Sequence, residues 1–305
     1  MTFLKWLSTL RTPFLDAVFY AITQLGDETL FLAVGLALYW CIHKKAGRYV
    51  LTIGLMGSLI SQWLKMICRI PRPWVRDPSH TIVEKARAGA GGYSFPSGHS
   101  QSSVGTFGGI AMVFRKKRVM LPVLALAVLV PFSRLYLGVH TPADVLVGSL
   151  ISVALIFVLY PLMMSESPAK ERFAILLTCV IATAYVLFFP MHGADTPEAE
   201  ANILHGLENA WKLLGSAFGL WLAFELDEAF IRFDPRAKLP MQIFKLAVGL
   251  ALCLGLRVAL KAAFAMLPSA QLADALRYFL IAVFGGAGWP AVFSALQKRS
   301  IAAHS

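Results

Sequence analysis

Charged residues are scarce in this sequence: Asp, Glu, Lys and Arg make up only 15% of its 305 residues, while 57% are hydrophobic. A soluble protein carries more charge than this, because its surface groups must face water. Together with a mean hydropathy of +0.66, the shortage of charge predicts a membrane protein. The apolar stretches alternate with charged or Pro- and Gly-rich breaks, and an open sheet could not satisfy its backbone groups in lipid. We therefore predict an all-α, polytopic helical membrane protein.

Cysteine is also rare, and its four copies, Cys41, Cys68, Cys179 and Cys253, lie within or at the end of apolar segments. They have neither CxxC spacing nor partners in a long loop, so we interpret them as packing thiols rather than metal ligands. The first residues lack the basic start, apolar core and small-residue cleavage site of a signal peptide. We therefore expect the first helices to direct membrane insertion.

Nine apolar segments are long enough to be transmembrane helices, at about 20 residues per span and fewer where a helix enters the protein interior. They cover residues 29–42, 49–63, 99–114, 119–139, 144–164, 173–191, 207–224, 241–260 and 276–296. Residues 14–25 are amphipathic and either lie in the membrane interface or extend the first span, so eight or ten spans remain open. We predict one domain, with a catalytic core of five spans in residues 1–165 and a four-helix membrane extension in residues 166–305.

The net charge of +11 is spread over short loops rather than gathered on one face, so it does not indicate nucleic-acid binding. Cytoplasmic loops are enriched in Lys and Arg, and every second loop here is basic, whereas residues 191–206 contain neither. This pattern predicts an N-terminus outside and a C-terminus inside. The basic loops hold Lys44, Lys45 and Arg48; residues 115–118; Lys170 and Arg172; Arg232, Arg236 and Lys238; and Lys298 and Arg299.

Three polar clusters stand at three helix ends, and because spans alternate in direction all three fall on the outer face. They are KMICRIPRP from residue 65, FPSGHS from residue 95 and SRLYLGVHTPAD from residue 133. Lys65, Arg72 and Arg134 bring three cations together with too few carboxylates to neutralise them. The chemistry of these side chains indicates a bound anion, and phosphate suits the planar fork of Arg and the point charge of Lys.

The second cluster supplies a helix start beside these cations. Ser97 is a good N-cap, and Gly98 allows the backbone to approach a ligand closely, so free backbone N–H groups can bind the same phosphate.

The third cluster places a histidine beside another helix start. Thr141 is a good N-cap, Pro142 suits the first helical position, and Asp144 completes a capping box. Asp144 can accept the N–H of the His140 ring and direct the other ring nitrogen at a phosphorus atom as a nucleophile. We give His99 the role of general acid and base. Three cations can stabilise the transferring phosphoryl group, so these residues require no metal and no cofactor.

In their order and spacing these residues resemble the signature of the type 2 phosphatidic acid phosphatase (PAP2) superfamily. The residues that match are Lys65, Arg72-Pro73, Pro96-Ser97-Gly98-His99, Ser133-Arg134, His140 and Asp144. The resemblance covers residues 29–164 and implies a metal-independent phosphatase with a phosphohistidine on His140. It also implies that Lys65, Arg72, Ser97, Gly98 and Arg134 bind the phosphate. The nine-span layout is similar to the glucose-6-phosphatase and sphingosine-1-phosphate phosphatase branches.

We therefore expect an integral membrane phosphatase that acts on a lipid phosphate or lipid pyrophosphate, with its site on the extracytoplasmic face of a bacterial cytoplasmic membrane. Candidate substrates are phosphatidate, phosphatidylglycerol phosphate, polyprenyl diphosphate and sphingoid-base phosphate. The alternatives are a lipid phosphotransferase that uses the same histidine, a phosphatase for a soluble sugar phosphate, and a membrane protein that binds anionic lipid without cleaving it.

Other polar residues are expected to have structural roles. Asp27 and Glu28 suit the N-terminus of the first span. Arg257 and Lys261, one helical turn apart, suit interfacial anchors, with contact to substrate as the alternative. Histidines outside the three clusters are expected at the surface; they are His43, His80, His192, His205 and His304.

Overall fold

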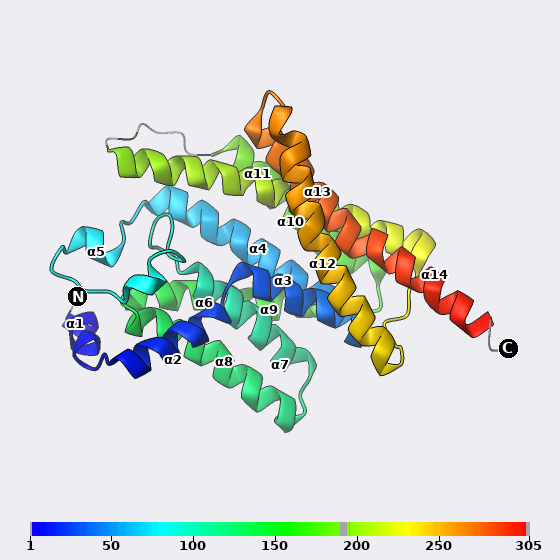
Figure 1. The fold of residues 1–305 in the computed structure, drawn as a ribbon, viewed down its shortest axis with the longest axis horizontal. Helices are drawn as coiled ribbons and strands as arrows, with labels where there is room; N and C mark the ends of the chain where they lie inside the picture. Colours follow the sequence, from blue (N-terminus) through cyan, green and yellow to red (C-terminus); the bar gives the residue numbers. More distant parts are fainter. Residues whose placement is uncertain (1, 190–193, 195, 303–305) are drawn as a thin grey trace.

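The structure, a computed structural model, describes residues 2–189, 194 and 196–302, and this part of the chain is helical with no strand (Figure 1). His192, Asp195 and His304 lie outside the described residues, as do the side chains of Lys298 and Arg299. The all-α prediction is confirmed for the described part.

The first half of the chain forms short outer helices and the long helices of the predicted core. They are α1 (Thr2–Thr9), α2 (Pro13–Gln24), α3 (Glu28–Ala37) with the π-helical η1 (Leu38–Ile42), α4 (Lys44–Cys68), α5 (Pro73–Arg76), η2 (Glu84–Ala86), α6 (Gly98–Ser103), η3 (Val104–Gly108), α7 (Gly109–Val113), α8 (Lys117–Tyr136) and α9 (Pro142–Met163). Residues 98–113 form one continuous helical segment, as predicted, but with a π-helical turn in its middle.

The second half continues with the helices of the predicted extension. They are α10 (Pro168–Leu187), α11 (Pro197–Leu226) with η4 (Asp227–Ile231), α12 (Leu239–Ala263) with η5 (Phe264–Met266), α13 (Ala270–Val283), η6 (Phe284–Gly288) and α14 (Trp289–Ala302). In Figure 1, α12 and α13 run across the middle of the molecule; α12 packs on α3 and on α13, and α13 packs on α11.

Five helical segments of the described chain are long and apolar enough to cross a membrane: residues 44–76, 117–136, 142–163, 239–266 and 270–297. A sixth arises if α2 and the residues 28–42 count as one span, although these two meet at 51°. The chain is thus a polytopic membrane protein, while the count of nine spans stays a prediction. Residues 14–25 form a separate helix, α2, rather than a straight extension of α3.

Local sequence signals place several helix starts. Asp27 caps α3 by accepting a hydrogen bond from the N–H of Thr29 (2.8 Å), as the acidic pair predicted. Thr141 and Asp144 form the predicted capping box at the start of α9. Such side chains satisfy backbone N–H groups that have no partner within the helix.

The two halves share one hydrophobic core. Trp40 and Tyr39 on η1 donate hydrogen bonds to the carbonyl oxygens of Gly285 (2.8 Å) and Gly286 (2.9 Å) on η6. On the extension itself, α11 packs closely on α13, because a Cβ at Gly215 or Gly219 would collide with the backbone of α13. The extension is therefore packed directly on the first half and is no separate lobe.

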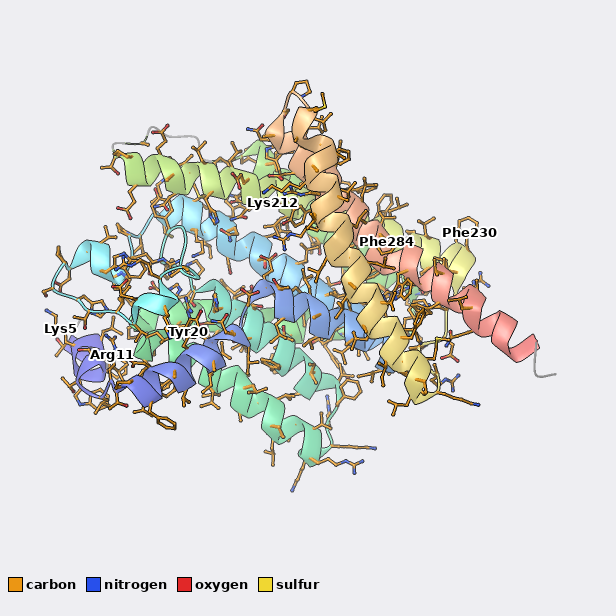
Figure 2. The ribbon with its side chains drawn as sticks, viewed as in Figure 1. Lys5, Arg11, Tyr20, Lys212, Phe230 and Phe284 are labelled. Carbon is orange, nitrogen blue, oxygen red and sulfur yellow. The ribbon has the colours of Figure 1, made fainter. Side chains whose placement is uncertain are left out.

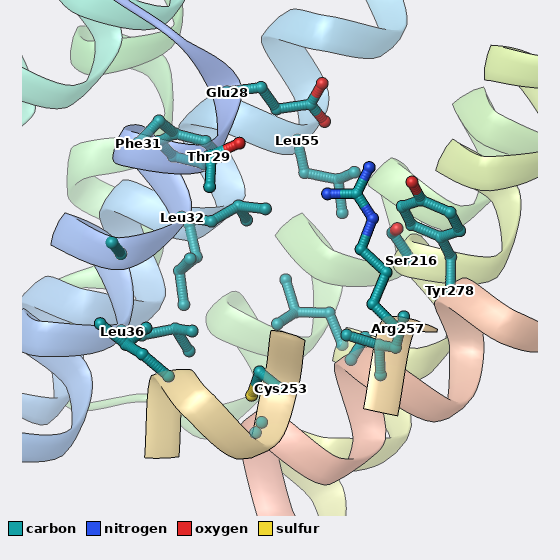
Figure 3. A pocket seen from close by; sticks show the side chains of 18 of the residues that line it. Glu28, Thr29, Phe31, Leu32, Leu36, Leu55, Ser216, Cys253, Arg257 and Tyr278 are labelled. Atoms are coloured by element: carbon teal, nitrogen blue, oxygen red, sulfur yellow. The ribbon is translucent and has the colours of Figure 1, made fainter. Parts of the chain in front are cut away.

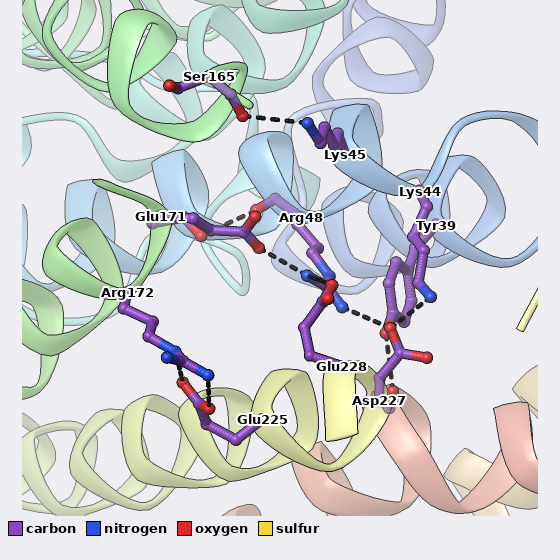
Figure 4. Close-up of polar contacts among 12 residues, drawn as sticks. Tyr39, Lys44, Lys45, Arg48, Ser165, Glu171, Arg172, Glu225, Asp227 and Glu228 are labelled. Carbon is purple, nitrogen blue, oxygen red and sulfur yellow. Dashed lines mark hydrogen bonds and ion pairs between the residues drawn. The ribbon is translucent and has the colours of Figure 1, made fainter. Parts of the chain in front are cut away.

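A buried ion network joins the first residues of α4 and α10 to η4 (Figure 4). Arg48 is only 2% exposed; it donates to Glu171 (2.7 Å) and Glu228 (2.8 Å) and pairs with Asp227, which also contacts Lys44 (2.5 Å). Charges this deeply buried are tolerated only when they are paired. The network therefore ties the first half to the extension at the end of α4 opposite to Lys65.

The N-terminal residues contact the loop after α5 and the end of α8. Lys5 pairs with Asp77 (3.0 Å), and Arg11 donates to the carbonyl oxygens of Tyr136 (3.0 Å) and Thr81 (2.9 Å). Lys5 and Arg11 lie together beside α1 in Figure 2, at the end of the molecule that carries the three polar clusters.

Candidate functional site

His140 and Arg72 meet at the centre of the three polar clusters. The Nε2 atom of His140 lies 2.8 Å from Nη1 of Arg72, and both side chains are buried, at 2% and 5% exposure. Because a guanidinium has only donors, Nε2 must accept, so the proton of the neutral ring is on Nδ1. The unprotonated nitrogen of His140 therefore faces the cations.

Asp144 lies on the other side of the His140 ring. Its Oδ2 atom is 3.4 Å from Nδ1, which is within ion-pair range but outside hydrogen-bond geometry. The same oxygen accepts hydrogen bonds from the hydroxyl of Ser94 (2.6 Å) and the N–H of Thr141 (2.8 Å). These bonds hold Asp144 against the ring, in the place from which it was predicted to orient His140.

Backbone carbonyls hold Arg72 and Lys65 in position. Arg72 donates to the carbonyl oxygens of Gly91 (2.6 Å), Gly92 (3.0 Å) and Val139 (3.2 Å), and Lys65 donates to that of Tyr93 (2.6 Å). The loop before α6 is thus wrapped around the two cations. None of these partners is a carboxylate, so an anion bound here would be the counter-ion of the two side chains.

Arg134 comes from the last turn of α8 and is 1% exposed. Its guanidinium donates to the hydroxyl of Thr23 (2.8 Å), and its Nε atom is buried without a hydrogen-bond partner in the structure. A buried donor without a partner is costly, so a ligand that accepts from Arg134 would be favoured. The neighbouring Ser133, in contrast, donates back to Val130 (2.6 Å) within the helix.

The start of α6 completes the cluster. Ser97 is the N-cap, as predicted: its hydroxyl oxygen accepts from the N–H of Ser100 (3.4 Å), and its own N–H donates to the carbonyl of Asp144 (2.9 Å). A Cβ at Gly98 would meet no atom within 4 Å, so the backbone there is open to approach. His99 follows and packs against the break between α2 and α3, where a Cβ at Gly26 would lie 3.0 Å from its carbonyl oxygen.

The electrostatics of the site favour a neutral, nucleophilic imidazole. Burial, and then the charges of Arg72, Arg134 and Lys65, lower the pKa of His140 well below its ordinary value of 6.5. The ring therefore stays unprotonated at neutral pH, while the three cations attract an anion to it. His99 also acts electrostatically on His140, so the second histidine lies in the same cluster.

The sequence analysis did not single out two residues that support the site. Ser94, which holds Asp144, has no local signal that marks it. His80 was expected at the surface but is 5% exposed, and its Nε2 donates to the carbonyl of Gly138 (2.9 Å). Gly138 has a φ of +78°, in the region that favours glycine, and this turn leads into His140.

The other expected surface histidines that the structure describes are exposed. His43 caps α4 by accepting from the N–H of Ala46 (3.1 Å), far from the cluster. His205 on α11 lies close to the site, because a Cβ at Gly92 would be 3.5 Å from its Nδ1 atom.

In the described part of the chain no group of three His, Cys, Asp or Glu side chains is placed so that it could hold a metal ion. The cluster combines His140, whose Nε2 accepts from Arg72, with a second histidine and the basic side chains of Lys65, Arg72 and Arg134. That arrangement suits the transfer of an anionic phosphoryl group.

Comparison with known proteins gives two matches along the chain. Residues 45–167 match the PAP2 superfamily, and residues 211–301 match the transmembrane extension of PAP2 superfamily phosphatases. The first match contains every residue of the three polar clusters. No solved structure matches the chain significantly.

Several curated proteins are similar to this chain. Undecaprenyl-diphosphatase BcrC of Bacillus subtilis is 30% identical over 149 residues, which cover 48% of this chain and 73% of the relative. Phosphatidylglycerophosphatase B of the same organism is 28% identical over 165 residues, or 48% and 75% of the two chains. Sphingosine-1-phosphate phosphatase 1 of Rattus norvegicus is 29% identical over 148 residues, which cover 46% of this chain but only 33% of the relative.

Proposed function

Because the chain belongs to the PAP2 superfamily of phosphatases, we propose that it removes phosphate from a lipid phosphate or lipid pyrophosphate through a phosphohistidine on His140. The observation that carries the proposal is the position of His140, with Nε2 at 2.8 Å from Arg72 and Nδ1 at 3.4 Å from Asp144. The lone pair of Nε2 accepts from Arg72 in this structure, and a phosphate that binds this guanidinium would take over the hydrogen bond and lie beside the freed lone pair.

The proposed reaction has two steps. In the first, Nε2 of His140 attacks the phosphorus atom, the bond from phosphorus to the lipid oxygen breaks, and His99, which enters the step as an imidazolium, protonates that oxygen and becomes neutral. In the second, His99 takes a proton from water, the water oxygen attacks phosphorus, and the P–N bond breaks to release inorganic phosphate. Lys65, Arg72 and Arg134, with the backbone at Ser97 and Gly98, bind the phosphoryl oxygens through both steps.

A lipid substrate is supported by the membrane setting and by the relatives. Their names specify undecaprenyl diphosphate, phosphatidylglycerophosphate and sphingosine-1-phosphate, which differ in the lipid and share a terminal phosphate. Three of the four candidate substrates correspond to a lipid in the name of a relative: polyprenyl diphosphate, phosphatidylglycerol phosphate and sphingoid-base phosphate. The shared chemistry is a phosphate at a membrane interface.

We place the site on the extracytoplasmic face of a bacterial cytoplasmic membrane, in a nine-span chain with residues 1–165 as the core. The cluster is at the opposite end of α4 from the basic residues Lys44 and Arg48. From Arg48 to Lys65 the helix rises about 25 Å, close to the thickness of the hydrocarbon layer. The basic loops then lie on the cytoplasmic side, where loops are enriched in Lys and Arg, and the cluster lies on the opposite side.

Phosphate release by the purified protein in detergent with EDTA tests the proposal, across the four lipid candidates. Wild type should release phosphate from at least one lipid, and His140→Ala should release none. His43→Asn is the matched control, because it changes an exposed histidine and retains a residue that can cap α4.

The other outcomes identify the alternatives. Phosphate release only when acceptor alcohols are added would replace hydrolysis by phosphotransfer. Release from sugar phosphates alone would replace the lipid by a soluble substrate. Equal release by wild type and His140→Ala would overturn the assignment of the nucleophile.

A further inference from the structure

A cavity of about 390 Å³ lies between the core and the extension, bounded by α3, α4, α11, α12 and α13 (Figure 3). Its walls are mainly apolar and include Phe31, Leu32, Leu36, Leu55 and Leu254. Its volume falls within the range of about 300–1,000 Å³ that is typical of ligand sites. The cavity belongs to neither half alone, since helices of both contribute its walls.

Polar groups are found among the apolar side chains of this cavity. Figure 3 shows the guanidinium of Arg257 extending from α12 toward the part of the cavity where Glu28 begins α3, with Tyr278 and Ser216 beside it. Within the described chain Arg257 makes no hydrogen bond or ion pair, although its charge acts on Glu28. A cation in this position can bind a polar or anionic group at the head of an apolar chain.

The polar end of the cavity adjoins the catalytic cluster. Asp27 and Glu28 line the cavity, and the preceding Gly26 packs against His99. On α4, Ser58 lines the cavity, and Lys65 follows two helical turns later, a rise of about 10 Å. A molecule with its phosphate at His140 could therefore pass the break between α2 and α3 and continue into the cavity.

The cavity also has apolar edges that face the surroundings of the protein. Leu32 on α3 and Leu254 on α12 both line it, and they are 42% and 52% exposed. In a membrane-spanning bundle such exposed apolar side chains face lipid. A hydrocarbon chain could thus enter from the bilayer between α3 and α12.

From these observations we propose that the cavity holds the hydrocarbon chain of the lipid substrate while its phosphate lies at His140, and that Arg257 contacts the polar group between them. This inference rests on the proposed function and gives the C-terminal extension a part in substrate recognition. Selection between lipids then depends on the length and shape of the chain that the cavity accepts.

Turnover of alkyl phosphates of increasing chain length tests this, with two substitutions on α12. Leu254→Trp fills the cavity, whereas Leu252→Trp places the same side chain at a 43% exposed position that does not line it. We expect Leu254→Trp to lower kcat/KM for the longest chains about tenfold, because overfilled apolar sites reject extra methylene groups. It should spare the shortest chains and p-nitrophenyl phosphate, and Leu252→Trp should match wild type throughout. An equal loss at all chain lengths, or equal effects of the two variants, would overturn the proposal.

A second measurement needs no turnover. His140→Ala is incubated with a lipid phosphate that carries a photoreactive diazirine at the end of its chain, and the labelled peptides are identified after irradiation. Labels on the cavity-lining residues of α3 and α12, displaced by unlabelled lipid phosphate, would support the proposal. Labels on other lipid-facing helices, or labels displaced equally by a neutral lipid, would overturn the proposal. If wild type released no phosphate but the cavity were labelled, the proposed function would fail while the chain site stood.

Discussion

The Nε2 atom of His140 lies 2.8 Å from Nη1 of Arg72, and this pair joins the loop after α4 to the turn before α9. A donor on Arg72 fixes which nitrogen of His140 is unprotonated, and Asp144 lies beside the other. The same guanidinium is also placed to bind a phosphate oxygen. Arg72 would therefore hold both the nucleophilic nitrogen of His140 and the phosphate that it attacks.

The two histidines should respond differently to the leaving group. We expect His140→Ala to lower kcat about 10³-fold or more on every substrate, because no other residue replaces the nucleophile. His99→Ala should cost about 10²–10⁴-fold on a lipid phosphate but far less on p-nitrophenyl phosphate, whose acidic leaving group needs no proton. Steady-state kinetics on both substrates measure this. Equal losses in His99→Ala on the two substrates would remove His99 from the role of acid.

Asp144 should act on the rate through the His140 ring. Asp144→Asn should lower kcat about 10²–10⁴-fold and leave KM nearly unchanged, since the neutral amide no longer stabilises the ring as it gains charge. Ser94→Ala is the matched control, because it removes one hydrogen bond to Asp144 and leaves the carboxylate; it should keep kcat within about tenfold of wild type. A loss in Asp144→Asn that appears only as raised KM would speak for a purely structural role.

The pH dependence should reflect the lowered pKa of His140. Burial and three neighbouring cations hold that pKa well below 6.5, so the free enzyme keeps a neutral nucleophile as the pH falls through 6.5. The acid limb of kcat/KM that belongs to the enzyme should therefore lie below pH 6.5. Ionisation of the substrate also changes kcat/KM with pH. Phosphorus NMR in the same detergent measures the pKa of the substrate, so that its contribution can be separated from that of the enzyme. An enzyme limb at or above pH 6.5 would contradict a neutral His140 in the free site.

Arg48 should matter for stability much more than an exposed ion pair does. Arg48→Met removes the cation that Glu171 and Asp227 share and leaves Lys44 as the remaining partner of Asp227, so it should lower the free energy of unfolding by about 3–5 kcal/mol. Arg172→Met breaks the more exposed pair with Glu225, 2.8 Å apart, and should cost about 0–1 kcal/mol. Unfolding of both variants in mixed micelles with increasing SDS compares them. Similar costs would mean that the buried network contributes little.

The sidedness can be measured with two single-cysteine proteins expressed in bacteria. The first retains only Cys68, which is exposed at the end of α4 near the catalytic cluster, and has Ser at the other three cysteine positions. The second has Ser at all four positions and carries Lys117→Cys, which places a thiol at the first residue of α8, at the opposite end of that helix from Arg134. An impermeant maleimide added to intact cells should label the first protein and not the second. The reverse pattern would invert the proposed topology.

The sequence by itself determined the helical class, the helix starts and the residue types of the cluster. Thr141, Asp144, Ser97 and Asp27 cap helices as their local patterns predict, because a cap depends on backbone groups only two or three residues away. The convergence of Lys65, Arg72, Arg134 and His140 on one face also followed from the alternation of spans. The number of spans did not follow from the sequence, since α2 and α3 meet at an angle that the hydrophobic pattern does not encode.

Only the tertiary structure decided which partners the polar residues find. The bond from Ser94 to Asp144, the burial of His80 under the turn at Gly138, and the packing of Gly26 on His99 join residues that are 50 to 73 positions apart in the chain. Contacts at such separations depend on how whole helices pack, and the residues involved carry no local signal. For the same reason the cavity between α3 and α12 could not be predicted: its walls come from both halves of the chain and exist only once the extension is packed on the core.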